Sequence, residues 1–271
     1  MSSSYRSLSI DIDGAVACVT LTGPGKGNAM GPATWEELAP AFAALDDNPQ
    51  VRAIVLRGSG AHFSYGLDLL AMMPTLADKV TGTVLAAKRQ ELLALIKQMQ
   101  AAAGAPAACR KPVIAAIDGW CIGGGLDLAA ACDIRICSAQ ARFSLREIRL
   151  AIVADLGSLQ RLPHIIGQGH TRQLAFTGED IDAARAQQIG LVNDVYADAE
   201  TLHEAAMGLA QRIAKNAPLT AMGAKEVLNV SQGRSIEDGL QHVALWNSAF
   251  LQSMELAEAI AAHMERREPN F

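Results

Sequence analysis

The chain has 271 residues, of which 50% are hydrophobic and 19% charged, a balance typical of a globular protein with a sizeable core. Its net charge of −5 argues against a nucleic-acid-binding surface. No apolar run is long enough to span a bilayer, and the N-terminal residues lack the pattern of a signal peptide. We therefore expect a cytoplasmic protein without membrane insertion.

The first third of the chain predicts strands, a loop and a helix. Residues 8–22 alternate apolar and polar side chains around Asp13-Gly14, which indicates a β-hairpin. A glycine-rich loop at 23–28 leads to a predicted helix at 32–45, and an apolar strand is expected at 51–56. The segment 72–83 has no clear periodicity, and we expect it to be mobile.

The rest of the chain alternates helices and strands and then becomes helical. A long helix is predicted at 84–103, and further helices and strands alternate up to a strand ending at 196. The later helices are expected at 199–214, 218–231 and 235–267. Alternation predicts α/β layering, so we expect an α/β core over 1–198 and a helical C-terminal region over 199–271. That region needs a partner for its apolar face, which is either the core or another subunit.

The five cysteines predict reduced thiols, because they form no CxxC pair and have no histidine nearby. The common catalytic motifs are missing: there is no P-loop, no GxGxxG fingerprint, no GxSxG elbow and no HExxH pair. We therefore expect no metal, flavin or nicotinamide cofactor.

The stretch 111–161 carries the candidate site. Gly123-Gly124-Gly125 follows a predicted strand and opens a helix, where unpaired N–H groups favour negative charge. Asp127, Glu147 and Asp155 follow and are candidate acids and bases. Each also has a plain structural explanation. Asp127 would favour the helix dipole, Asp155 would cap the next helix, and Glu147 would lie on a solvated face.

Several segments resemble the crotonase (enoyl-CoA hydratase/isomerase) superfamily from about residue 8 to 265. The motifs that carry the resemblance are Gly27-Asn28-Ala29-Met30, Phe63-Ser64-Tyr65-Gly66-Leu67-Asp68, residues 111–119, Gly123-Gly124-Gly125-Leu126-Asp127-Leu128, Cys132-Asp133-Ile134-Arg135 and 143–162. The resemblance implies a spiral of ββα units, with C-terminal helices that assemble a trimer or hexamer.

The resemblance also implies an acyl-CoA thioester as substrate, and coenzyme A as part of that substrate rather than a separate cofactor. It implies an oxyanion hole made by the backbone N–H groups of Tyr65 and Gly124, although Tyr65 replaces a small residue common at its position. Lys26, Asn28 and Ala29 match the family's CoA-binding loop. Arg110 and Lys111 are weaker candidates for the same role.

The three acids decide between subfamilies. Enoyl-CoA hydratases, which are lyases, hold water with two glutamates at the positions of Asp127 and Glu147. The extra acid, Asp155, resembles the isomerases that convert 3,5-dienoyl-CoA to 2,4-dienoyl-CoA in β-oxidation of fatty acids. By that resemblance Asp155 is the base at C2, Glu147 the proton donor at C6, and Asp127 a supporting group. Two alternatives stay open: a hydratase that uses Asp127 and Glu147, and a non-catalytic acyl-CoA-binding protein.

Overall fold

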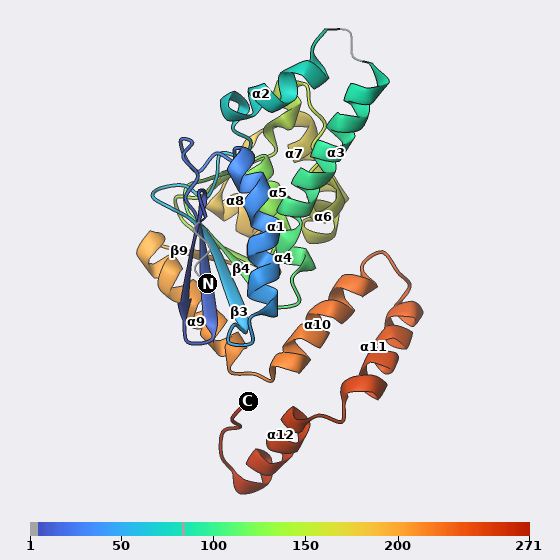
Figure 1. The fold of residues 1–271 in the computed structure, drawn as a ribbon. Coiled ribbons are helices and arrows are strands. Elements are labelled where there is room, and N and C mark those ends of the chain that lie inside the picture. Colours follow the sequence, from blue (N-terminus) through green and yellow to red (C-terminus); the bar gives the residue numbers. More distant parts are fainter. Residues whose placement is uncertain (1–4, 83–84) are drawn as a thin grey trace.

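The main sheet of the protein has six strands in the order β1-β2-β3-β4-β6-β9. The computed structural model describes residues 5–82 and 85–271 (Figure 1). Only β1 runs antiparallel to its neighbour. The strands are β1 (Leu8–Asp13), β2 (Val16–Leu21), β3 (Ala53–Gly58), β4 (Val113–Ile117), β6 (Ile134–Ser138) and β9 (Asp194–Tyr196).

The predicted hairpin is confirmed, with β1 and β2 paired from Leu8↔Leu21 to Asp13↔Val16. Gly14 has φ +57 in its turn, a conformation that glycine adopts without strain. A second, small sheet has the order β5-β7-β8. Its strands are β5 (Trp120–Ile122), β7 (Arg142–Ser144) and β8 (Asp180–Asp182), and none of them was predicted.

Alternate residues of the main sheet point to two separate cores. Val16 and Cys18 of β2 pack against α9 (Ala199–Ala214), whereas Ala17 and Val19 pack on the opposite face. That opposite face is covered by α1 (Pro32–Asp47), and Figure 1 shows α1 and α9 on the two sides of the sheet. The predicted α/β layering is thus present.

The remaining helices of the core are α2 (Leu69–Val80), α3 (Ala86–Ala103), α4 (Ala105–Ala108), α5 (Gly124–Ala130), a 3-10 helix (Arg146–Leu150), α6 (Ser158–Ile165), α7 (Gly167–Thr177) and α8 (Ala183–Gln188). Of these, α5 and α8 contact the small sheet, whereas α3 and α4 pack on α1. The expected mobile segment at 72–83 is mostly helix α2, whose first turn is capped by Asp68 accepting from the Ala71 N–H. Val84, where the long helix was expected to begin, lies outside the described residues, as do the first four residues of the chain.

The C-terminal helices extend away from the sheets (Figure 1). They are α10 (Pro218–Ser231), α11 (Ile236–Phe250) and α12 (Met254–Glu265). The single helix expected at 235–267 is therefore two helices, because Ser253 caps α12 by accepting from the Leu256 N–H. Lys225 of α10 anchors this region on the core, with its Nζ 2.8 Å from the Asp133 carboxylate. Within the described residues, no helix combines the length and the apolar character that crossing a bilayer requires.

Candidate active site

Asn28 joins the two loops that frame the site. Its Nδ2 donates to the carbonyl oxygens of Ser59 (2.9 Å), His62 (2.7 Å) and Phe63 (3.3 Å), and its Oδ1 accepts from the Ser59 hydroxyl at 2.8 Å. Asn28 also adopts φ +54, a left-handed conformation that asparagine tolerates better than most residues. All of its side-chain groups are thus used inside the protein, so the expectation that its side chain binds CoA is not supported.

The other predicted CoA-binding residues differ in their availability. Lys26 is exposed and makes no ion pair within the described part of the chain, and Ala29 is half-buried on the same loop. The Arg110 guanidinium is held by Asp46 at 2.6 Å, and the buried Lys111 donates to the Leu45 carbonyl at 2.6 Å. Lys26 therefore remains the cation that can meet a ligand phosphate.

One of the two expected oxyanion donors is already hydrogen-bonded within the protein. The Tyr65 N–H donates to the Gly27 carbonyl at 2.9 Å, so it is already occupied. Among the described residues, the Leu67 N–H makes no hydrogen bond, and Gly124 opens α5, where an N–H has no partner in its helix. Gly66 allows these two groups to approach, because it has no side chain: a Cβ placed on it would lie only 3.0 Å from the Gly124 nitrogen. The pair of free donors is therefore Leu67 and Gly124.

Glu147 lies beside this pair of donors. A Cβ atom placed on Gly123, which has φ +51, would be only 3.2 Å from Glu147 Oε1. Because glycine has no Cβ, the Glu147 carboxylate can occupy this space. Burial raises the pKa of Glu147 to about 7, and the negative charges of Asp127 and Asp155 add to the effect. Glu147 is half-buried, and its Oε2 is enclosed without a hydrogen-bond partner in the described chain. The solvated-face interpretation of Glu147 is thus wrong.

Asp127 is buried, with 1% of its surface exposed. Its Oδ1 accepts from the Ser158 N–H at 2.6 Å, so Asp127 caps the start of α6 from a different helix. Burial raises its pKa to about 6, the charge of Asp155 adds to this, and the bonds from Ser158 and the charge of Arg161 oppose it. The helix-cap interpretation of Asp155 is wrong, because no bond from the Asp155 side chain caps α6.

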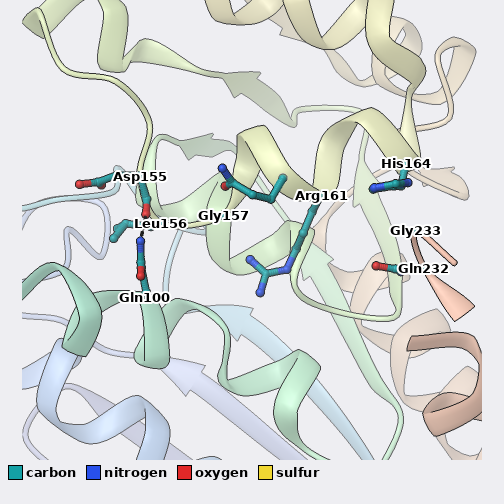
Figure 2. A pocket seen from close by; sticks show the side chains of 9 residues that line it. Gln100, Asp155, Leu156, Gly157, Arg161, His164, Gln232 and Gly233 are labelled. Atoms are coloured by element: carbon teal, nitrogen blue, oxygen red, sulfur yellow. Dashed lines mark hydrogen bonds between the residues drawn. The ribbon is translucent and has the colours of Figure 1, made fainter. Parts of the chain in front are cut away.

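Asp155 lies on the loop before α6, half-buried, and burial raises its pKa. Gln100 of α3 donates to the Asp155 carbonyl at 2.6 Å (Figure 2). Figure 2 also shows Arg161 extending from α6 into the same cavity, which measures about 470 Å³. Glu147 lines a different, mostly apolar cavity of about 150 Å³ with Ile148, Ile152, Val153 and Phe176 among its walls. Asp155 and Glu147 thus line different cavities, and the charge of Asp155 nevertheless raises the pKa of Glu147.

The three acids, the two free N–H groups and the exposed lysine are the groups that this part of the fold offers to a ligand. No cluster of His, Cys, Asp and Glu side chains suited to a metal ion occurs within residues 5–82 and 85–271.

The comparison with known families shows to which family the chain belongs. The sequence profile described as enoyl-CoA hydratase/isomerase matches residues 11–271, and the chain therefore belongs to this family of enzymes, the crotonase superfamily. Two solved structures share the fold. A putative enoyl-CoA hydratase from Streptomyces coelicolor has a TM-score of 0.90 at 29% identity, covering 100% of this chain and 96% of its own. An enoyl-CoA hydratase from Bacillus anthracis has a TM-score of 0.88 at 28% identity, covering 98% and 99%. The predicted crotonase-like fold is confirmed.

Among the curated relatives, the chain is 42% identical to the peroxisomal Delta(3,5)-Delta(2,4)-dienoyl-CoA isomerase of Arabidopsis thaliana, over 99% of this chain and 98% of that one. It is 37% identical to the mitochondrial protein of the same name from Homo sapiens, over 98% of this chain and 81% of that one. A probable enoyl-CoA hydratase of Mycobacterium tuberculosis is 34% identical, over 98% of both chains.

Proposed function

We propose that the protein converts 3,5-dienoyl-CoA to 2,4-dienoyl-CoA in fatty-acid degradation. The observation that carries the proposal is the third acid: Asp155 lies within electrostatic reach of both Asp127 and Glu147. Moving a double bond across a conjugated chain needs a base at one end and an acid at the other, and one pair of acids around a single water does not supply them. The names of two relatives at 42% and 37% identity support the same activity.

The thioester carbonyl binds between the Leu67 and Gly124 N–H groups in this proposal. As a proton leaves C2, negative charge develops on the carbonyl oxygen, and prearranged donors stabilise it by several kcal/mol. Lys26 meets the phosphates of the CoA moiety as a mobile positive charge. No other cofactor takes part, because the step transfers only protons.

The positions of the acids lead us to reverse the roles that the family resemblance suggested. A carbonyl oxygen on the Gly124 N–H places C2 one carbon away, on the side where Glu147 lies against Gly123. Glu147 therefore takes the C2 proton, and Asp155, the third acid of the site, delivers a proton to C6. The electron pair of the broken C2–H bond moves along the conjugated chain to form the new C6–H bond. A pKa near 7 makes Glu147 a strong base that is still partly ionised at neutral pH.

The C-terminal helices support assembly into a homo-trimer or hexamer. Leu240, Leu251 and Met254 of this region expose most of their surface, with Met254 at 90%. We place the association region in α10–α12 instead of the whole of 199–271, because α9 already packs on the main sheet. The five cysteines are free and buried, which supports a reducing compartment, and we propose the cytoplasm.

A hydratase that uses Asp127 and Glu147 is the second candidate, favoured by their mutual electrostatic effect and by the Mycobacterium tuberculosis relative. A non-catalytic binding protein is disfavoured, because such a protein has no need to bury three acids near free donors.

The deciding experiment offers a 3,5-dienoyl-CoA and a 2-enoyl-CoA separately to the wild type, to Asp155→Asn and to the control Asp47→Asn, whose side chain is exposed at the end of α1.

We expect fast isomerisation, slow hydration, and a loss of isomerisation of about 10²–10⁴-fold in Asp155→Asn alone. Full-rate hydration with a silent Asp155→Asn would establish the hydratase. Binding of both esters without turnover would establish the binding protein.

A further inference from the structure

The segment that carries Lys26 has few bonds of its own. Within the described chain, the one backbone–backbone hydrogen bond that involves residues 24–27 is donated by the Tyr65 N–H to the Gly27 carbonyl, at 2.9 Å. A short segment with so few bonds samples many conformations, and ordering it has an entropic cost when a ligand binds. The contacts that hold this segment therefore affect how well Lys26 can meet a ligand.

The side chain of Tyr65 packs directly against the same segment. A Cβ placed on Gly27 would lie only 2.8 Å from Cδ2 and from Cε2 of the Tyr65 ring, so the ring occupies the space next to the glycine backbone. Gly27 also has φ +61, a conformation that glycine adopts without strain. Tyr65 thus holds Gly27 both by its backbone and by its ring, one residue away from Lys26.

His62 fixes the Tyr65 ring from another side. The two rings are stacked, with their centroids 5.0 Å apart and their planes at 28°. His62 Nδ1 accepts from the Trp120 N–H at 3.3 Å, so in the neutral imidazole the proton is on Nε2. Nε2 lies 3.1 Å from the Tyr65 hydroxyl oxygen and donates to it. The ring therefore lies between the anchored His62 and the loop.

We propose that Tyr65 is a positioning residue for Lys26, and that His62 holds Tyr65 in place for this purpose. The ligand is the phosphate-bearing nucleotide part of a CoA thioester, so the inference rests on the proposed function. Tyr65 keeps the loop in one conformation before the ligand arrives, which reduces the entropic cost of binding. The exposed lysine side chain stays free to follow the phosphates.

Two other roles for Tyr65 predict different behaviour. A side chain that serves packing alone would lower the free energy of unfolding when it is removed and would leave KM unchanged. A side chain that narrows the thioester pocket would change the kinetics with every acyl thioester, whether or not the thioester carries phosphates. The positioning role concerns only ligands that bear the phosphates.

The test compares two thioesters of one 3,5-dienoic acid: the CoA ester and the pantetheine ester, which lacks the phosphates. Tyr65→Ala should raise KM for the CoA ester about tenfold, keep kcat within about twofold, and leave both constants for the pantetheine ester unchanged. Lys26→Ala should give the same pattern. Tyr196→Ala is the matched control, since it removes a half-buried tyrosine on the α9 side of the main sheet and should change neither constant.

The double variant Tyr65→Ala, Lys26→Ala separates positioning from direct contact with the ligand. Because Tyr65 acts through Lys26, KM of the double variant for the CoA ester should equal that of Lys26→Ala. Effects on KM that multiply would overturn the inference. So would an unchanged KM in Tyr65→Ala, or a change of the same size for both thioesters.

Gly27→Ala is a second variant that leaves Tyr65 itself intact, should Tyr65→Ala fail to fold. Its Cβ must displace the Tyr65 ring, so KM for the CoA ester alone should rise, and an unchanged KM would overturn the inference.

Calorimetric titration with CoA itself separates the inference from the proposed function. A wild type that binds CoA without isomerising the dienoyl ester, together with a Tyr65→Ala variant that binds CoA about tenfold more weakly, would overturn the isomerase and support the positioning role. A wild type that isomerises the dienoyl ester, together with a Tyr65→Ala variant that binds CoA as tightly as the wild type, would overturn the positioning role alone. A wild type that does not bind CoA would overturn both.

Discussion

Replacing Asn28 tests whether this residue holds the loops of the site or binds the ligand. Asn28→Gly removes the donor to three backbone carbonyls and the acceptor for the Ser59 hydroxyl. At about 1 kcal/mol net for each bond to a carbonyl, the free energy of unfolding should fall by roughly 3 kcal/mol. Asn28→Ala should lose about 1–2 kcal/mol more, because alanine is strained at φ +54 whereas glycine is not.

Urea denaturation followed by circular dichroism measures both variants. Asn216→Gly is the matched control, since Asn216 is exposed at the end of α9 and its side chain makes one hydrogen bond, to the Arg212 carbonyl. It should cost less than about 1 kcal/mol. An Asn28→Gly protein that is as stable as the wild type, but whose KM for the acyl-CoA has risen about tenfold, would refute the structural role and restore the ligand-binding one.

Two further measurements follow from the site and from the C-terminal helices. The value of kcat/KM for isomerisation should follow a bell-shaped pH profile, because Glu147, whose pKa is about 7, must be ionised while Asp155 must be protonated. Asp127→Asn should move the limb of the profile that Glu147 sets to lower pH, because the charge of Asp127 raises the Glu147 pKa. A pH profile that does not move would show that the charge has no such effect. In analytical ultracentrifugation the protein should sediment as a trimer or hexamer at micromolar concentration, and the double variant Leu251→Asp, Met254→Asp should sediment as a smaller species. A wild-type monomer would contradict the association.

Local signals in the sequence were sufficient for elements whose residues are neighbours in the chain. The Asp13-Gly14 turn and the two strands around it form their hydrogen bonds within 14 residues, from Leu8 to Leu21, and the prediction is confirmed. Strand β5 has three residues and exists because it pairs with β7, about 20 residues later, so no local pattern indicates it. Helix α2 was expected to be a mobile segment, and its capping by Asp68 is the signal that was missed.

In the site, too, local sequence indicates some features, whereas others depend on contacts between residues that are far apart in the chain. Family resemblance identified the loop that contains Tyr65, but the choice between Tyr65 and Leu67 depends on which N–H is already bonded, and that is decided by Gly27 on another loop. Asn28 had the position of a ligand contact, whereas its amide bonds to carbonyls 31 to 35 residues further along the chain. Gly66, with φ +77 next to the Gly124 nitrogen, is the residue that could have indicated the pair of free N–H groups.

The proposed use of backbone donors for the thioester oxygen has a consequence for how such a protein can change during evolution. Every residue except proline carries an N–H group, so most substitutions at Leu67 leave the donor in place, and the close approach at Gly66 is the vulnerable point. The acids, by contrast, are side chains on three different segments, one on α5, one on the 3-10 helix and one on the loop before α6. An evolving protein can therefore replace one acid at a time and acquire a new reaction, while the backbone donors that bind the acyl thioester stay unchanged.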